Sequence, residues 1–133
     1  MKKINEGWGN GLKEEALQLL SQFNLATERL LEVFPANKVG RKFVKDWESR
    51  FNRALFEVQT YYFARVPEAA FKAYSAKFLG EFKKFSAKER AFQESIETTT
   101  KSRDRYFTRF DLLRQLTNKV FKTTIVDLPV PKP

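Results

Sequence analysis

The stretch RDRYFTRFDLLRQLTNKVF, residues 103–121, decides the fold class of this chain. At about 3.6 residues per turn, its large apolar side chains fall on one face of a helix. These side chains are Tyr106, Phe110, Leu113, Leu116 and Val120. Arg109 falls at the edge of the same face, where an arginine is paired, reaches water along its apolar stem, or binds an anion. The stretch therefore predicts an amphipathic helix with a cation beside its core-facing stripe.

The stretch RKFVKDWESRFNRALFEVQTYYFARV, residues 41–66, predicts a second helix that is apolar on two sides and therefore central in a bundle. Two interpretations of Arg109 remain open. In the first, Arg109 forms an ion pair with Glu57 of this helix and fixes how the two helices pack. In the second, arginines of both helices line a groove for a phosphate or a partner: Arg50, Arg53, Arg105 and Arg109.

Three further helices are expected. One covers residues 11–34 after a glycine-rich turn that ends at the expected cap, Asn10. Another covers residues 67–85, with a proline in its first turn. A short third helix begins at SAKE, residues 86–89, which has the form of a capping box. The helix at 11–34 is expected to bury a stripe of apolar residues: Leu12, Ala16, Leu19, Phe23, Leu30 and Phe34.

The fold class expected is all-α: a single-domain, irregular bundle of about five helices. Residues 1–10 would form an N-terminal turn segment and residues 11–122 the bundle. Residues 123–133 would form an extended or disordered tail, since three prolines stand in the last five positions. The threonines at 98–100 are poor helix formers and would separate the last two helices, the second of which Ser102 would cap.

The composition excludes several classes of site. The chain has no cysteine and no histidine, which removes disulfides, thiol nucleophiles, the usual catalytic triads and most transition-metal ligands. The sequence GWGNG, residues 7–11, does not have the form of a nucleotide-binding loop. We therefore predict no catalytic residue, no metal and no cofactor. No apolar run of the length that spans a bilayer occurs, so a cytoplasmic protein with no membrane contact is expected.

Positive charge is concentrated in parts of the chain. The formal net charge is +9, yet residues 11–34 hold two basic and four acidic side chains. Residues 36–53 and 70–90 each hold six basic and two acidic side chains, and residues 98–122 hold seven and two. Such segregation indicates a basic face for DNA or an acidic protein partner, although solvated helix faces give the same pattern. The candidate binding residues are Arg41, Lys42, Arg50, Arg53, Lys101, Arg103, Arg105 and Arg109.

Two segments, FNRALFEVQTYYF (51–63) and AFQESIETTTKSRDRYFTRFDLLRQLTNKVF (91–121), carry a resemblance. They resemble the helical C-terminal region of the GmrSD-type restriction and defence family, which joins a ParB/sulfiredoxin-like NTPase domain to further modules. The matching positions are Phe51, Asn52, Ala54, Leu55, Phe56, Glu57, Phe92, Ile96, Thr99 or Thr100, Arg109 and Phe110.

In that family, NTP binding belongs to an N-terminal domain with a DGQQR-like motif, and no such motif occurs here. The resemblance therefore implies a non-catalytic helical module of a restriction or anti-phage defence protein. Its implied partner is a ParB-like NTPase or nuclease domain, on the same or another chain. The alternative function is a pure assembly or scaffold protein, in which the positive charge is incidental, and a homo-oligomer is one form that such an assembly would take. A carboxylate-dependent nuclease is the third hypothesis.

Overall fold

The computed structural model describes residues 2–97 and 103–129, with only the backbone described for residues 2–10 and Leu12. Over these ranges the chain forms five α-helices and a short 3-10 turn, with no strand beyond an isolated bridge between Phe43 and Trp47. The expected all-α, single-domain fold is therefore confirmed. The elements are α1 (Lys2–Val33), η1 (Ala36–Lys38), α2 (Arg53–Phe63), α3 (Glu68–Lys88), α4 (Arg90–Ser95) and α5 (Arg103–Phe121).

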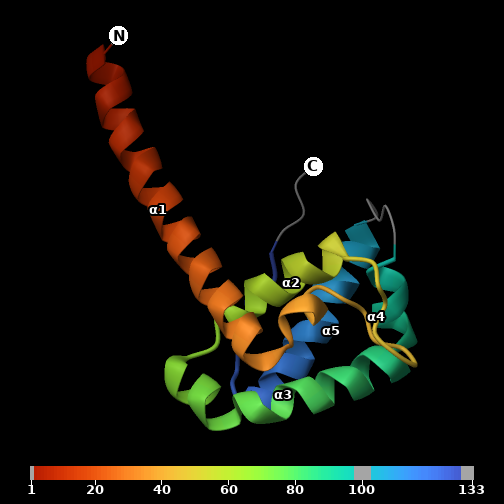
Figure 1. Ribbon diagram of the computed structural model, residues 1–133. Coiled ribbons are helices and arrows are strands. Elements are labelled where there is room, and N and C mark those ends of the chain that lie inside the picture. The colour runs from red at the N-terminus through yellow and green to blue at the C-terminus, as the bar shows by residue number, and fades with distance from the viewer. Residues whose placement is uncertain (1, 98–102, 130–133) are drawn as a thin grey trace.

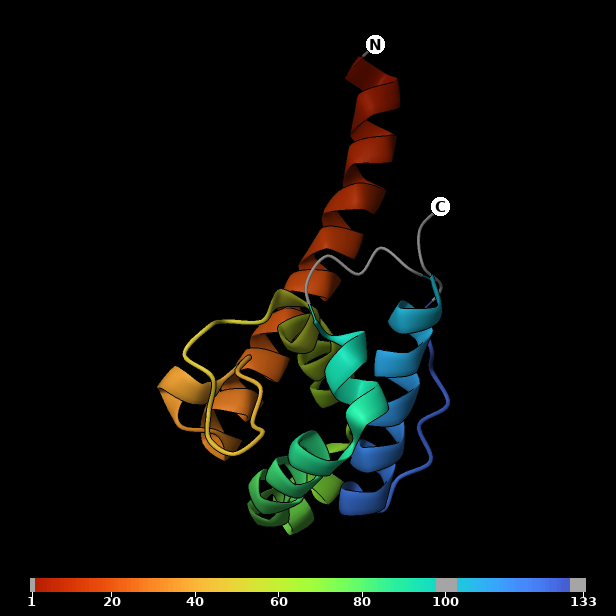
Figure 2. The ribbon, with the colours of Figure 1, turned by 90° about the vertical axis from the view of Figure 1, so that its right-hand side faces the viewer.

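The helices α2, α3, α4 and α5 form the bundle, and the C-terminal part of α1 packs on it (Figure 1). The rest of α1 projects away from the bundle, as Figure 2 also shows. Phenylalanine rings fill the core and meet edge to face or stacked, the arrangements that aromatic pairs prefer. Fully buried rings come from every part of the bundle: Phe34, Phe63, Phe78, Phe82, Phe92, Phe110 and Phe121. No helix of the described residues is both long and apolar enough to cross a membrane.

Helix α1 differs from the prediction at its start. It begins at Lys2, so the expected turn at residues 1–10 is helical from its second residue, and no cap at Asn10 is needed. Glycine costs a helix interior only about 1 kcal/mol relative to alanine, so isolated glycines weaken a helix without ending it. The bundle proper therefore lies within 11–122, while the first turns of the same helix precede it.

The apolar stripe of α1 is buried over only part of its length. Leu30 and Phe34 lie in the core as predicted, together with Ala26. Leu19 and Phe23 do not, because their exposed fractions are 61% and 46%. The prediction that they belong to the core is wrong because the bundle ends beside Phe23, and no described element covers the stripe before it.

Residues 41–52 are not helical, which corrects the prediction of one helix over 41–66. They form a loop whose ends meet, since the Asn52 amide donates to the Gly40 carbonyl at 2.8 Å. Inside the loop, the Glu48 amide donates to the Lys42 carbonyl at 2.9 Å. The Asn52 side chain then caps α2 by accepting from the Leu55 amide at 3.0 Å.

One aromatic residue of this loop, Trp47, packs against the core, and a second, Phe43, packs on Trp47. The Trp47 ring stacks on Phe82 with 6.5 Å between centroids and meets Phe34 edge to face at 6.3 Å. Phe43 meets Trp47 edge to face at 5.2 Å. The spacing of four that suggested a helical stripe therefore arises from a loop that folds its rings onto α3.

The expected capping box at 86–89 is also absent. Ser86 lies inside α3, fully buried, and its hydroxyl accepts from the Phe43 amide at 3.1 Å. The end of α3 is instead stabilised from α4, because the Gln93 side-chain amide donates to the carbonyls of Ser86 and Ala87 at 2.7 and 3.0 Å. The expected breaks at 98–100 and the cap at Ser102 lie outside the described residues.

The described part of the tail, residues 123–129, forms no helix or strand and runs against α2 and α5. The Tyr62 hydroxyl donates to the Asp127 carbonyl at 2.7 Å, and the Arg65 side chain pairs with the Asp127 carboxylate at 3.1 Å. Asn118 of α5 both donates to the Ile125 carbonyl and accepts from the Ile125 amide, each at 2.9 Å. These bonds hold the segment in place without a helix or strand.

Candidate functional site

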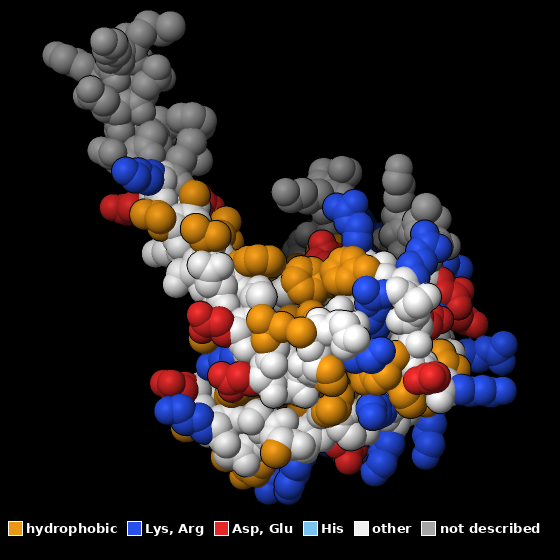
Figure 3. All heavy atoms as spheres, in the orientation of Figure 1, with side chains coloured by type: hydrophobic (Ala, Val, Ile, Leu, Met, Phe, Trp, Pro, Cys, Tyr) orange, Lys and Arg blue, Asp and Glu red, His pale blue; other side chains and the backbone are white. Residues whose placement is uncertain are grey.

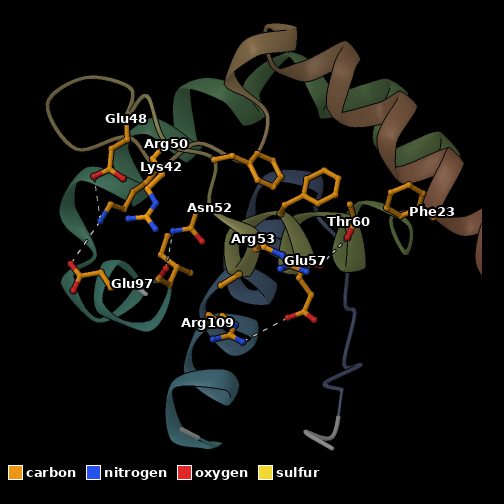
Figure 4. Close-up of a pocket in the computed structure, with 14 residues that line it drawn as sticks. Phe23, Lys42, Glu48, Arg50, Asn52, Arg53, Glu57, Thr60, Glu97 and Arg109 are labelled. Carbon is orange, nitrogen blue, oxygen red and sulfur yellow. Dashed lines mark hydrogen bonds and ion pairs between the residues drawn. The ribbon is translucent and has the colours of Figure 1, made fainter. Parts of the chain in front are cut away.

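A groove of about 1080 Å³ is bordered by α1, the loop 41–52, α2, the end of α4 and α5 (Figure 4). Its lining divides into an apolar side and a charged side. The charged side carries the basic residues Lys42, Arg50, Arg53 and Arg109 and the acidic residues Glu48, Glu57 and Glu97. Four cations against three carboxylates leave a small positive excess. We call this feature the groove.

Three rings form the apolar side, which we call the aromatic wall: Phe23, Phe51 and Phe56. The Phe56 ring lies 6.1 Å from that of Phe23 and 5.3 Å from that of Phe51, so the three form a row. Phe51 is 44% exposed although it belongs to a packed loop. A row of half-exposed rings beside charged groups is typical of a surface that another molecule covers.

The position of the Phe51 ring depends on Gly40. The Gly40 backbone has φ of +70°, a left-handed conformation that residues with a Cβ rarely adopt. A Cβ at this position would also overlap the Phe51 ring. The Gly40 amide donates to the side chain of buried Gln59 at 3.2 Å, which fixes the loop against α2. Gly40 therefore sets where one end of the aromatic wall lies.

Arg109 lies on the floor of the groove and is only 6% exposed. Its Nη2 lies 3.7 Å from Glu57 Oε1, so the ion pair predicted between α5 and α2 is present. The Glu57 side chain is 56% exposed, so one side of this ion pair faces solvent. Arg109 Nη1 donates to the Ser95 carbonyl at 3.1 Å, and its guanidinium lies 5.0 Å from the centre of the Tyr106 ring.

These contacts explain how a cation is tolerated beside the core stripe of α5. Burial lowers the pKa of the Arg109 guanidinium, and the charge of Glu57 partly opposes that shift. Because the Ser95 carbonyl ends α4, one side chain joins α2, α4 and α5. Arg109 thus contributes mainly to packing.

Lys42 has a similar part at the other end of the groove. Its side chain is 10% exposed and lies 3.5 Å from Glu48 and 3.8 Å from Glu97. Two carboxylates beside one ammonium group neutralise it, so little of its charge is available to a ligand. Asn52 completes this end, because its side-chain amide donates to the Ile96 carbonyl at 2.7 Å.

Arg50 and Arg53 are different, because both are exposed on the rim of the groove. No carboxylate of the described residues lies within ion-pair distance of either guanidinium. Both line the groove: Arg50 lies at the end that holds Lys42 and Glu48, and Arg53 lies nearer the middle (Figure 4). These two arginines are the cations of the groove that a partner can reach.

The structure brings together only part of the predicted binding set. Lys42, Arg50, Arg53 and Arg109 line the groove. Arg103 and Arg105 are exposed in the first turn of α5 but do not line it, so the predicted pairing of Arg105 with Arg109 in one groove is not observed. Arg41 is half-buried outside the lining, and Lys101 lies outside the described residues.

Other lining residues are not predicted by the sequence pattern. The sequence predicts Phe23 and Phe51 on the apolar faces of two helices. A hydrophobic pattern does not show whether another helix or loop covers such a face. Glu48 and Glu97 lie 49 positions apart, and only the folded loop brings them to the same lysine. Among the side chains described, those of residues 11 and 13–97 and 103–129, no three of metal-ligating type converge.

Comparisons of this chain with family models, with curated proteins and with solved structures found no match.

Proposed function

We propose that this chain is a non-catalytic helical module that docks an acidic, amphipathic segment of a protein partner in the groove. The observation that carries the proposal is that the aromatic wall lines the same groove as two exposed arginines, Arg50 and Arg53. Apolar side chains of a docked helix would cover the rings, as in helix-in-groove recognition. Acidic side chains beside them would meet the rim arginines, which favours fast association and the correct orientation.

The charges inside the groove favour a polypeptide over a nucleic acid. Lys42 and Arg109 are already paired with carboxylates. Glu57 and Glu97 are more than half exposed and would repel a phosphate backbone. A peptide can place apolar groups there and direct its own charges elsewhere.

DNA is the second candidate, and a specific feature supports it. Lysine and arginine side chains gather along the side of the bundle away from the free end of α1 (Figure 3). Arg103 and Arg105 are exposed, and the net charge of +9 favours any polyanion. Binding of this kind would depend on cations and salt, and not on the aromatic wall.

A pair of variants separates the two candidates in titrations followed by fluorescence anisotropy. The probes are a labelled helical peptide rich in Leu and Glu, and a labelled DNA duplex, each at several salt concentrations. Phe51→Ala should weaken peptide binding about tenfold, since a docked ring is typically worth more than 1 kcal/mol. It should leave DNA binding unchanged. Arg50→Glu with Arg53→Glu should weaken both.

The matched control for charge is Lys88→Glu with Lys119→Glu, two exposed positions outside the groove. This control should leave peptide binding nearly intact. If the control and the groove variant weaken the peptide equally, binding is non-specific attraction and the docking function is wrong. If only DNA binds, and more tightly as salt falls, the second candidate replaces the first.

The resemblance described above supplies a biological setting for the proposal. We propose that the module acts within a restriction or anti-phage defence protein, docked on a ParB-like NTPase or nuclease domain. Phage plating on cells with and without the gene tests this setting, and the Arg50→Glu, Arg53→Glu variant tests the part of the groove in it. Equal plating on all three strains would remove the defence role and leave the docking function to be judged by the titrations.

A further inference from the structure

We infer that α3 and the end of α5 form a second binding surface, which takes the phosphate backbone of a nucleic-acid duplex irrespective of its base sequence. This surface lies outside the groove, and the inference does not depend on what the groove binds. We call the surface the lysine face, and its side chains are all exposed: Lys77, Lys84, Lys88 and Lys122.

The lysine face has a pair of like charges at one ring. The ammonium groups of Lys77 and Lys122 lie 5.9 and 5.0 Å from the centre of the Tyr74 ring, so α3 and the end of α5 each bring a cation to it. No carboxylate of the described residues lies within ion-pair distance of either ammonium group. Two such charges repel each other, and a bound anion would neutralise both.

The backbone at Lys122 has a conformation that suits glycine. Lys122 directly follows α5 and has φ of +55°. The Thr123 amide donates to the Asn118 carbonyl at 3.1 Å, the bond that marks a Schellman end of a helix. Glycine is the usual residue at this position, because a Cβ is strained in the left-handed region. A lysine where glycine fits the backbone better indicates that its ammonium group acts outside the fold.

Lysines continue from Lys77 along α3. At about 100° and 1.5 Å per residue, Lys77, Lys84 and Lys88 share one side of the helix and span about 16 Å. Glu81 lies in the same row and pairs with Lys84 at 3.7 Å, whereas Lys77 and Lys88 have no such partner among the described residues. Glu81 is the one acidic residue of positions 71–88, against five basic residues. Cations in a row do not converge on one small anion, so they fit an extended chain of negative charges.

The residue types favour a duplex over other polyanions. An ammonium group is a point charge that binds phosphate without the planar match of arginine, and phosphate contacts carry no base sequence. A row of about 16 Å lies beside about five phosphates of one strand. The Tyr74 ring already has ammonium groups over it, so it is a poor platform for the bases of a single strand. Figure 3 shows basic side chains along the edge of the bundle at which Figure 1 places α3.

Titration of a labelled DNA duplex, followed by fluorescence anisotropy at several salt concentrations, tests the inference. Lys77→Gln should reduce the slope of log affinity against log salt by about one, because one phosphate contact is lost. The matched control Lys13→Gln removes the same charge from the projecting half of α1 and should leave the slope unchanged. Two duplexes of unrelated sequence should bind equally. Equal changes of slope in the two variants, or a marked preference for one duplex, would overturn the inference.

Lys122→Gly separates binding from folding, because its two expected effects have opposite signs. Glycine relieves the left-handed residue and should raise the melting temperature by about 3 °C. The lost ammonium group should weaken duplex binding about fivefold at low salt. A lower melting temperature would show that Lys122 serves the fold, and an unchanged affinity would show that it does not contact the duplex. Either result contradicts the inference.

Probes of other chemistry test the kind of partner. Polyglutamate and a single DNA strand should each bind more weakly than the duplex at the same salt concentration. If either binds as tightly as the duplex, or if the wild type binds no duplex at low salt, the inference is wrong. Phe51→Ala keeps this outcome separate from the groove, since it should leave duplex binding unchanged. Loss of duplex binding in Phe51→Ala would place the nucleic acid in the groove and not on the lysine face.

Discussion

The two halves of α1 are one helix with one apolar stripe in two environments. From Ala26 to Val33 the stripe is covered by α2 and α3, and before Phe23 no described element covers it (Figure 1). The residue types of the stripe hardly change along it. The difference therefore comes from the length of the helices opposite, since α2 has only 11 residues. An amphipathic pattern shows that a face requires a cover, but it does not identify the molecule that supplies one.

The buried half has a second attachment that the projecting half lacks. Arg29 is 6% exposed, and its Nη1 donates to the carbonyls of Phe63 and Val66 at 2.7 and 2.6 Å. Its guanidinium lies 4.8 Å from the centre of the Phe71 ring. Burial lowers the pKa of Arg29, and the charges of Glu68 and Glu32 partly oppose this. One side chain thus ties α1 to the turn between α2 and α3.

The largest expected effect is the loss of stability when a leucine is removed from the buried half of the α1 stripe. Leu30→Ala should lower the free energy of unfolding by about 2–5 kcal/mol, the usual cost of a cavity in a packed core. Leu19→Ala changes the same residue type on the same face and should cost less than about 0.5 kcal/mol in the monomer. Urea denaturation measures both. Equal losses would show that the two halves have the same environment.

Replacement of Arg29 should produce the next largest effect. Arg29→Met keeps an apolar stem but leaves the Phe63 and Val66 carbonyls without their donor. The expected loss is about 3 kcal/mol, because buried acceptors are costly to leave unpaired. Lys13→Met removes an exposed cation from the projecting half and should change stability by less than about 0.5 kcal/mol. A small effect of Arg29→Met would mean that packing alone holds the buried half.

Two glycines sharpen the comparison, because Gly40 in the bundle has no room for a Cβ whereas Gly11 in the projecting half of α1 has open space. Gly40→Ala should cost about 2 kcal/mol, since its φ of +70° disfavours a Cβ that would also meet Phe51. Gly11→Ala in the projecting half places a Cβ in open space and should increase helicity without loss of stability. Thermal denaturation followed by circular dichroism distinguishes these outcomes. Destabilisation by Gly11→Ala would show that the outer turns of α1 are packed.

The smallest effect is a pH dependence that belongs to the bundle alone, because residues 2–25 contain no tyrosine. Burial raises the pKa of Tyr62 well above its usual value of about 10. Above that pH the unfolded chain loses a proton that the folded chain keeps, so stability should fall as pH rises beyond about 10. Tyr62→Phe should flatten this decline. At neutral pH it should cost about 1 kcal/mol, since it removes the bond to the Asp127 carbonyl.

The sequence was sufficient for much of the fold. The stripe of α5 predicted its length and its buried face, and Arg109 beside that stripe predicted the pair with Glu57. These features depend on residues close together on one helix, or on a charge that requires a partner. Local periodicity is a good guide where both faces of a helix have their expected neighbours.

The loop 41–52 shows where that reasoning fails. Phe43, Trp47 and Phe51 recur every four residues, which is the spacing of a helix face. The loop produces the same spacing because it returns on itself between Gly40 and Asn52. Asn52 is the sequence feature that indicates where α2 begins, since asparagine is a preferred N-cap and here caps α2. The groove was beyond prediction, because its lining comes from distant segments that meet only in the fold.

The continuity of α1 has a mechanical consequence. Each residue of an α-helix advances about 1.5 Å, and no break separates the outer turns from the turn that holds Arg29. A molecule that displaces the outer end therefore applies its force at the bonds from Arg29 to the Phe63 and Val66 carbonyls. Binding of a molecule to the projecting half of α1 would then alter these two hydrogen bonds at the turn between α2 and α3, far from the place of contact.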